Sequence, residues 1–346
     1  MHRKNCLLCF MLLLCSLTGA QNAEKTFKKR LQVLSTVFID SIPVTPSCHA
    51  SNIIEIPGGF MATWFGGEHE SHPLVGIYIA KFLNGKWSTP KEVANGKQFN
   101  GKQFPTYNPV LQRYPDGEIV LFYKVGPGPS AWWGMLTRTT DNGNTWSALE
   151  KLPNQIFGPI KNKAYLTASG VLICPSSSED SGWRTHVEFT ADKGKTWKRT
   201  LALNNSKDMG IIQPALLIHS DKHMQMLMRS QQDTIMSVES YDGGQHWDKP
   251  VRSTLPNPNS GIDAVTHSSG LHILVYNPTR KDGLDRGELA VAISKDGKRW
   301  DHQLTLEREK GSEFSYPAII EDKKHNLQIT YTWNRKRIKH VVVQLN

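Results

Sequence analysis

The chain has 346 residues and a formal net charge of +10 at pH 7, a balance that favours anionic partners through long-range electrostatics. Nucleic acid is not expected among them, because the chain has no basic run with interleaved aromatic residues and no recognised nucleic-acid-binding module. An acidic glycan fits the charge better, and no stretch beyond the N-terminus is apolar enough to span a membrane.

Residues 1–20 have the pattern of a secretory signal peptide. Arg3 and Lys4 form a basic start, residues 7–17 are almost entirely apolar, and residues 18–20 offer small side chains for cleavage. The apolar run is too short for a transmembrane helix. We therefore expect an exported protein, periplasmic or extracellular.

The cysteines are few. A lipoprotein anchored through Cys15 is disfavoured, because Leu14 before it is bulkier than lipoprotein processing prefers. Only Cys48 and Cys174 remain in the mature chain, which is no disulfide framework, and their spacing leaves open whether they pair.

A short acidic turn that ends on tryptophan recurs along the chain. Full copies lie at residues 139–146, 190–197, 240–247 and 294–300, and a degenerate copy lies at 84–87. The tryptophans are 50 to 59 residues apart, a period that suits one four-stranded sheet, the blade of a β-propeller. Aspartate and glycine suit a tight turn and tryptophan packs on its own blade, so we expect a structural role for these turns.

Strand signals recur at fixed offsets before each turn. One set, directly before the turns, covers residues 75–80, 134–138, 185–189, 234–238, 288–293 and 338–343. A second set covers 59–65, 119–124, 171–174, 224–229, 271–276 and 327–333. Six strands in each set predict an all-β, six-bladed β-propeller of four-stranded antiparallel blades over residues 31–346, after a linker at 21–30. The strand-like segment 31–42 is expected to complete the last blade and close the ring, which removes exposed sheet edges.

The innermost strands are predicted to begin around one end of the central channel, which we call the mouth. Their first residues are His49, Asn108, Asn162, Gln213, Asp263 and Tyr316. All of them are polar, so we expect a ligand site at the mouth.

Arginines lie close to this ring in the sequence. Arg229 ends a second-set strand, Arg286 precedes a strand of the first set, and Arg335 follows the last second-set strand. The planar guanidinium suits a carboxylate, because it donates two parallel charged hydrogen bonds.

With its acidic turns, known there as Asp-boxes, the chain resembles the sialidase superfamily of six-bladed propellers over essentially the whole mature length. The resemblance implies an exo-glycoside hydrolase in which three arginines bind the sugar carboxylate and a tyrosine is the nucleophile. It implies that Arg229 and Arg286 are the second and third arginines and that Tyr316 is the nucleophile. This chain departs from the family at His49, where the first arginine is expected, and at Gln213, where a glutamate activates the tyrosine. Neutral glutamine cannot take the phenolic proton.

Several residues are candidates for the proton donor and for the base. Glu70 and Glu68 lie on the glycine-rich loop where the family has its acidic residue, and His49 or Asp263 would replace the missing glutamate. His49 and the histidines of that loop match no metal-ligand spacing, so neither metal nor cofactor is expected.

Further polar and aromatic residues near the mouth suit sugar recognition. They are Gln213, Asn108, Asn162, Lys124, Trp133, Arg184, Asn277 and Arg335. Trp132 and Trp133 are neighbours on a strand and point to opposite faces, so at most one of them is expected to stack on a sugar.

The sequence thus predicts an exported monomer that hydrolyses the terminal acidic sugar of a glycan. Two other functions fit the same residues. One is a lyase on uronate-containing polysaccharides, with Tyr316 or His49 removing a proton beside a neutralised carboxylate. The other is a binding propeller that has kept the arginines without turnover.

Overall fold

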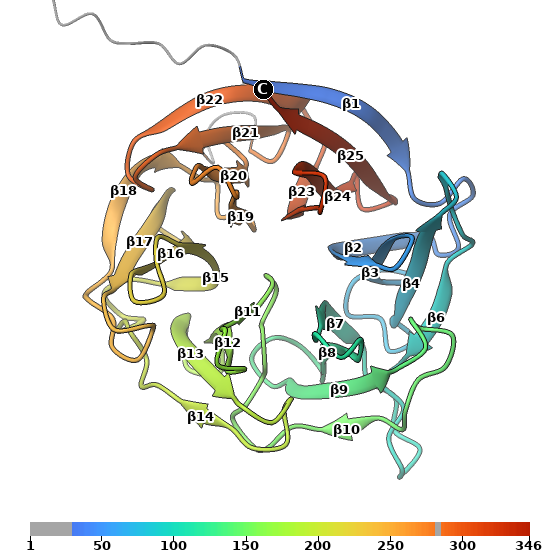
Figure 1. Ribbon diagram of the computed structural model, residues 1–346. Coiled ribbons are helices and arrows are strands. Elements are labelled where there is room, and N and C mark those ends of the chain that lie inside the picture. Colours follow the sequence, from blue (N-terminus) through green and yellow to red (C-terminus); the bar gives the residue numbers. More distant parts are fainter. Residues whose placement is uncertain (1–29, 281–284) are drawn as a thin grey trace, which may run out of the picture.

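A computed structural model describes residues 30–280 and 285–346. Within them every regular element is a β-strand, and six sheets form a ring around the axis of the predicted channel (Figure 1). No helix in the described ranges is long and apolar enough to cross a membrane. The predicted signal peptide and residues 21–29 of the linker lie outside the described residues. The predicted six-bladed all-β fold is confirmed.

Each blade runs from the channel outward in chain order. The innermost strands are β2 (Ser47–Ile56), β7 (Thr106–Arg113), β11 (Tyr165–Leu166), β15 (Ile211–Ile218), β19 (Asp263–Thr266) and β23 (Phe314–Glu321). The second strands are β3 (Gly59–Gly67), β8 (Ile119–Val125), β12 (Leu172–Ser178), β16 (Met224–Ser230), β20 (His272–Tyr276) and β24 (Asn326–Trp333). The third strands are β4 (Gly76–Leu83), β9 (Trp133–Thr139), β13 (Arg184–Thr190), β17 (Thr234–Ser240), β21 (Glu288–Ser294) and β25 (Arg337–Leu345).

The outer strands complete the sheets. They are β5 (Lys86–Trp87) and β6 (Lys91–Ala94) in the first blade, then β10 (Glu150–Lys151), β14 (Lys198–Arg199), β18 (Val251–Pro256) and β22 (Trp300–Arg308). The sixth blade receives β1 (Leu31–Phe38), which pairs antiparallel with β25 (Figure 1). The N-terminal strand therefore completes the sixth blade and closes the ring, as the sequence predicted.

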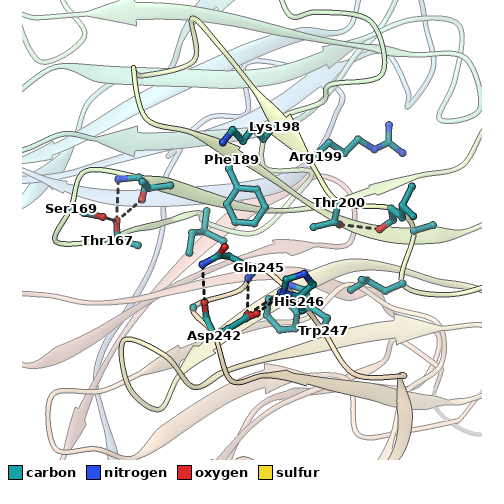
Figure 2. A pocket seen from close by; sticks show the side chains of 16 residues that line it. Thr167, Ser169, Phe189, Lys198, Arg199, Thr200, Asp242, Gln245, His246 and Trp247 are labelled. Atoms are coloured by element: carbon teal, nitrogen blue, oxygen red, sulfur yellow. Dashed lines mark hydrogen bonds and ion pairs between the residues drawn. The ribbon is translucent and has the colours of Figure 1, made fainter.

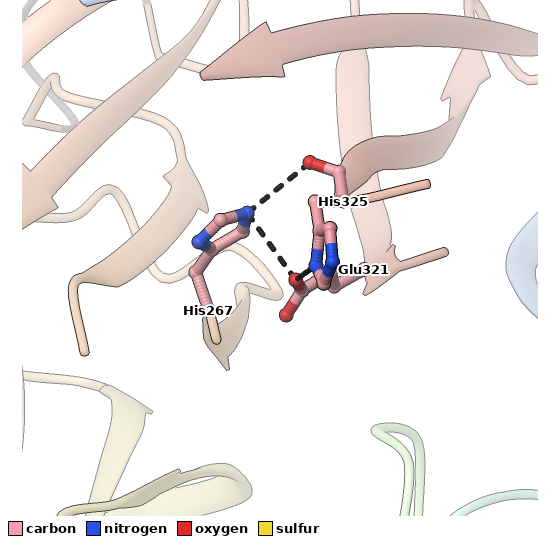
Figure 3. A group of neighbouring side chains, drawn as sticks. All are labelled: His267, Glu321 and His325. Carbon is pink, nitrogen blue, oxygen red and sulfur yellow. Dashed lines mark hydrogen bonds and ion pairs between the residues drawn. The ribbon is translucent and has the colours of Figure 1, made fainter. Parts of the chain in front are cut away.

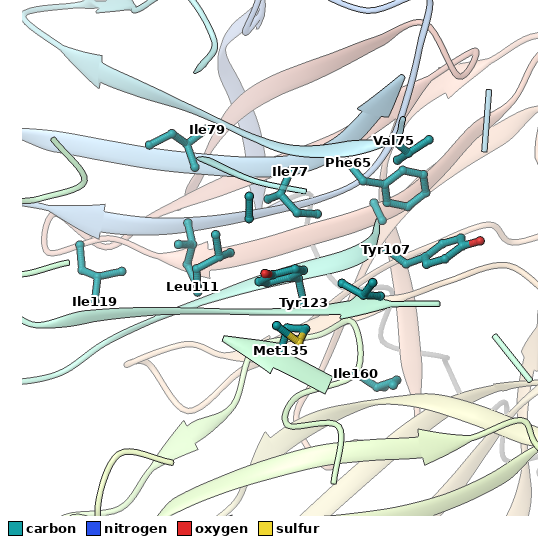
Figure 4. Packing of buried hydrophobic residues seen from close by; sticks show 14 of the residues in the cluster. Phe65, Val75, Ile77, Ile79, Tyr107, Leu111, Ile119, Tyr123, Met135 and Ile160 are labelled. Atoms are coloured by element: carbon teal, nitrogen blue, oxygen red, sulfur yellow. The ribbon is translucent and has the colours of Figure 1, made fainter. Parts of the chain in front are cut away.

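The hydrophobic core fills the spaces between neighbouring blades. Between the first two blades, Phe65 and Ile77 pack with Leu111 and Tyr123 (Figure 4). All seven residues of β8 are buried, because both faces of an inner strand lie against protein. Cys48 and Cys174 are buried free thiols, so they do not form a disulfide with each other.

The acidic turns connect third strands to outer strands, at the end of the blades away from the mouth. In the turn at 240–247, Ser240 accepts from the Gly244 amide at 3.0 Å and Asp242 accepts from the His246 amide at 2.9 Å. The His246 amide bond and the other donors outweigh burial and lower the pKa of Asp242 to about 2. The Trp247 indole donates to the Gly244 carbonyl at 2.8 Å. The turns are self-contained hairpin structures, in agreement with the structural role that the sequence indicated.

Acid should destabilise this fold through its buried histidines. Burial lowers the pKa of His340 to about 4, and burial with the nearby His219 lowers that of His272 to about 4. Between about pH 6.5 and 4 the unfolded chain binds protons that these folded imidazoles reject, so stability falls as pH falls. Each histidine should contribute about 2 kcal/mol of loss between pH 7 and 5.

Urea unfolding at the two pH values measures this loss. His340→Gln should show a smaller loss than the wild type, whereas substitution of the exposed His302 should leave the loss unchanged. Equal losses in the wild type and His340→Gln would contradict the assignment.

Candidate functional site

β-Bulges where the inner strands begin turn polar side chains into the mouth. The register shifts at Asn108, Gln213 and Tyr316, whose φ angles are 41°, 55° and 52°, and a proline follows each. In β2 the shift falls on Ala50, with φ 56°, one residue later than the sequence alignment placed it. The alignment of His49 with these residues was therefore wrong by one position, because no proline marks the bulge in the first blade.

Tyr316 lies at the centre of the site and is partly exposed. Arg229 Nη1 donates to the Tyr316 phenol oxygen at 2.6 Å and to Gln213 Oε1 at 3.2 Å. Gln213 Nε2 lies 3.4 Å from the same phenol oxygen. The tyrosine, the glutamine and the arginine that the sequence predicted are thus in direct contact.

Arg229 is fixed on the side away from Tyr316. Its Nε and Nη2 donate to Asn259 Oδ1 at 3.0 and 2.7 Å, and its guanidinium lies 5.0 Å from the Trp183 ring centroid. Only 6% of Arg229 is exposed, and burial lowers its pKa from the usual arginine value. A buried arginine in a fixed orientation is preorganised to bind an anion.

Two more arginines share one carboxylate, that of Glu313. Arg286 Nη1 and Arg335 Nε lie 3.1 and 2.8 Å from Glu313 Oε1. Ser315 Oγ donates to the same oxygen at 2.6 Å. Arg335 also pairs with Glu70 at 2.6 Å, across the junction between the sixth and first blades. Burial acts against ionisation of Glu313, but Arg335, Ser315 and Arg286 outweigh it and lower the pKa.

The imidazole ring of His49 packs against the ring of Tyr316, with 4.0 Å between the ring centroids. Its Nδ1 lies 3.0 Å from Thr332 Oγ1, and its Nε2 has no hydrogen-bond partner within the described ranges. Burial, followed by the charges of Arg335 and Arg286, lowers its pKa well below the usual value. His49 is therefore neutral and adds no positive charge to the site.

Lys161 lies below this group in the channel. It donates to the carbonyls of Ile262 at 3.0 Å and of Pro317, and its Nζ is 5.7 Å from the Tyr316 ring centroid. Burial lowers its pKa to about 7. Asn162 accepts from Lys161 at 2.9 Å and donates to the Gln213 carbonyl at 3.1 Å. These two residues support the mouth from beneath.

Asp263 also lies in the channel, but it is engaged in structural contacts. Both carboxylate oxygens lie 2.9 Å from Lys163 Nζ, and Oδ2 accepts from the Ile319 amide at 2.9 Å. The contacts connect the third, fifth and sixth blades. Asp263 therefore has a structural role in joining the blades, whereas its position in the sequence suggested a role in binding or catalysis.

Removing this charge should destabilise the ring. Asp263→Asn leaves Lys163 without its ion-pair partner, and we expect a loss of about 2–3 kcal/mol in the free energy of unfolding. Urea denaturation measures it. The double variant Lys163→Met/Asp263→Asn should lose less free energy of unfolding than the two single variants lose together. If the losses are strictly additive, Lys163 and Asp263 are not coupled.

The other residues that the sequence predicted for sugar recognition or proton donation differ in their burial and in their contacts. Lys124 and Asn277 are fully buried and donate to backbone carbonyls, so they stabilise loops rather than face a ligand. Trp133 packs on Phe104, with 5.4 Å between ring centroids. Arg184 pairs with Asp180 at 2.7 Å. Asn108 is buried at the bulge of β7, and Glu68 is exposed on the loop before β4.

Sequence reasoning missed Glu313 and Glu179. Strand β12 continues to Ser178, four residues beyond its predicted end, because Pro175 and the serines after it looked like a loop. Glu179 follows directly at the mouth, where it bonds the Trp183 side chain, and burial raises its pKa. Glu313 lies three residues before Tyr316 in the sequence. This proximity is the one sequence signal that could have marked Glu313 as part of the site.

A cavity of about 740 Å³ lies elsewhere, between the third and fourth blades (Figure 2). Phe189, Lys198 and Trp247 line it, and its Asp242 is engaged in the acidic turn. None of its lining residues belongs to the Tyr316 group, so this cavity is separate from the candidate site.

Comparison with known proteins agrees with this architecture. The family described as BNR repeat-like domain matches residues 58–329. Among curated proteins, no sequence matches the chain.

Solved structures with the same fold are distant in sequence. A protein of unknown function from Dyadobacter fermentans is 14% identical with a TM-score of 0.74, over 91% of this chain and 99% of that one. NanB sialidase from Streptococcus pneumoniae is 13% identical with a TM-score of 0.69, over 90% and 71%. Trypanosoma rangeli sialidase is 16% identical with a TM-score of 0.67, over 90% and 58%. At these identities the likeness establishes a sialidase-like propeller fold, as the sequence predicted.

Proposed function

The chain belongs to the BNR repeat-like domain family, and from this premise we propose that it is an exported glycoside hydrolase that removes a terminal acidic sugar from a glycan. The observation that carries the proposal is the contact between Arg229 and the Tyr316 phenol oxygen, with Arg286 and Arg335 beside it. A coarser statement, that a sialidase-like propeller processes or binds glycans, rests on the fold itself.

The carboxylate of the sugar would be bound by arginines of three blades. Arg229 comes from the fourth, Arg286 from the fifth and Arg335 from the sixth. Arg335 would supply the positive charge that neutral His49 cannot. Glu313 would keep Arg286 and Arg335 in position, since it pairs with both.

Tyr316 would act as the nucleophile. Its phenol oxygen attacks the anomeric carbon, the bond to the leaving oxygen breaks as that oxygen receives a proton, and water then cleaves the tyrosyl–sugar bond. The phenolic proton must go to a base, which Gln213 cannot be. His49, packed on the tyrosine ring, is the candidate, but its lowered pKa makes it a weak base. The Arg229 donor therefore has the larger part in activation, because it stabilises negative charge on the phenol oxygen.

Three carboxyl groups are candidates for the proton donor. Glu70 is engaged in an ion pair with Arg335 at 2.6 Å. Glu68 is exposed on the same loop. Glu179 is at the mouth and its pKa is raised by burial, which is the property a general acid needs. Glu179 is therefore added to the two donors that the sequence suggested.

The cellular site and the state of assembly are part of the proposal. Export rests on residues 1–20, and sequencing the N-terminus of the secreted protein should give a start at or near Gln21. Light scattering should show a monomer. A retained N-terminus or a larger assembly would contradict these points.

A panel of acidic oligosaccharides tests the function. Sialyllactose and glucuronate-terminated disaccharides should include one from which the purified protein releases the free acidic sugar. An unsaturated product, detected by its absorbance, would show that the protein is a lyase and not a hydrolase. Binding measured by calorimetry without any product would show that it is a glycan-binding propeller. The proposal would be refuted if the protein neither bound nor converted any sugar of the panel.

A further inference from the structure

The face opposite the mouth carries a second group of titratable side chains, apart from the Tyr316 site. His267 lies in the turn between β19 and β20, Glu321 ends β23, and His325 lies in the turn between β23 and β24. Figure 3 shows the three side chains pointing toward one another across the junction of the fifth and sixth blades. Within the described part of the chain, this is the group of histidine, cysteine and acidic residues whose ligand atoms are close enough to share an ion.

The distances suit a small cation. One ligand atom from each residue lies within 4.8 Å of the other two. His267 Nε2 is 3.3 Å from Glu321 Oε1, and His325 Nδ1 is 2.7 Å from the same oxygen. Zinc bonds to imidazole nitrogen and carboxylate oxygen are about 2.0–2.2 Å, so tetrahedral ligands are about 3.3 Å apart. The first pair already has that separation, and the second needs a small opening.

Neighbouring groups orient the ligands. Ser268 binds both carboxylate oxygens of Glu321, its amide donating to Oε2 at 2.7 Å and its Oγ to Oε1 at 2.5 Å. Oε1 is also the oxygen beside both histidines, so a metal bound there replaces the Ser268 hydroxyl. His267 Nδ1 accepts from the Ser269 amide at 3.1 Å, and Nε2 lies 3.1 Å from the His325 carbonyl, so Nε2 carries the proton here. Metal binding at Nε2 therefore requires the other tautomer, in which Nδ1 donates to Ser269 Oγ, 2.9 Å away. Such partners of a ligating histidine fix its ring and its tautomer.

We propose that His267, Glu321 and His325 form a zinc site that joins the fifth blade to the sixth. Two imidazoles and one carboxylate match the ligands that zinc prefers, with a fourth position left for water. Only 6% of His267 is exposed, whereas 66% of the His325 side chain is, so the ion enters from the His325 side. The ion stabilises the ring and takes no part in chemistry at the mouth.

Zinc titration of the EDTA-treated mature protein tests the site. Calorimetry should give one saturable site, and zinc should raise the melting temperature because it binds the folded state. Glu321→Gln and His325→Ala should each weaken zinc binding at least about 100-fold and remove the thermal shift. His325 is exposed, so its replacement should not prevent folding.

A second histidine group on the same face provides the matched control. His219 stacks on His223 with ring centroids 4.2 Å apart, and His272 Nε2 lies 3.1 Å from His219 Nδ1. His223→Ala should leave zinc binding unchanged, and so should Tyr316→Phe, which separates this site from the proposed function. No saturable binding to the wild type, or full binding by Glu321→Gln, would overturn the proposal. Loss of binding in His223→Ala would place the ion at the other group and overturn it equally.

Discussion

Tyr316→Phe is expected to reduce turnover of the best acidic substrate by at least about 10³-fold, because it removes the oxygen that forms the bond to the sugar. Binding should change little, since the ring and its packing against His49 remain. Steady-state kinetics give kcat, and calorimetry on the same variant gives Kd. The phenylalanine keeps the shape of the site, so the loss should appear in kcat rather than in KM.

The control for Tyr316→Phe is Tyr241→Phe, because Tyr241 is exposed and lies within the acidic turn at 240–247 on the other face. It should keep wild-type activity. If Tyr316→Phe also keeps it on a confirmed substrate, Tyr316 is not the nucleophile. If it loses binding and turnover together, the phenol oxygen serves recognition instead.

Arg229→Ala is expected to weaken binding of the acidic sugar by about 2–5 kcal/mol, the usual cost of removing one partner of a buried charged contact. This corresponds to a roughly 30- to 5000-fold increase in Kd. The loss is large because Arg229 is 6% exposed and its fork is already oriented by Asn259. Calorimetry with the sugar identified in the panel measures it.

Two further variants sharpen the test of Arg229. Arg229→Lys keeps the charge without the planar fork, so it should bind with intermediate affinity. Arg308→Ala removes an arginine whose side chain is 68% exposed, and it should bind like the wild type. Equal binding by Arg229→Ala and Arg308→Ala would exclude Arg229 from the carboxylate site.

The blade pattern could be predicted well from the sequence. Third strands β4 and β25 lie where the segments 75–80 and 338–343 predicted them, because buried apolar residues recur along each strand and leave a recognisable pattern. The exceptions are local. Strand β12 runs past a proline and a row of serines, and the bulge of β2 has no proline to mark it.

The candidate site could be predicted only in part. Tyr316, Gln213 and Arg229 were predicted together because each follows a recurring position of the blade. The roles of Asp263 and Asn277 were not, because a polar residue near a strand end can bind a ligand or satisfy a backbone group, and only the contacts distinguish the two.

The sequence by itself determined the number of blades and their order, since these follow from a repeat about fifty residues long. The tertiary structure decided which charges meet. Arg335 lies between Glu313 and Glu70, residues at opposite ends of the chain, and they come together only because β1 closes the ring beside β25. No local pattern encodes that encounter, because the energy of a charged contact depends on the distance and burial that packing imposes.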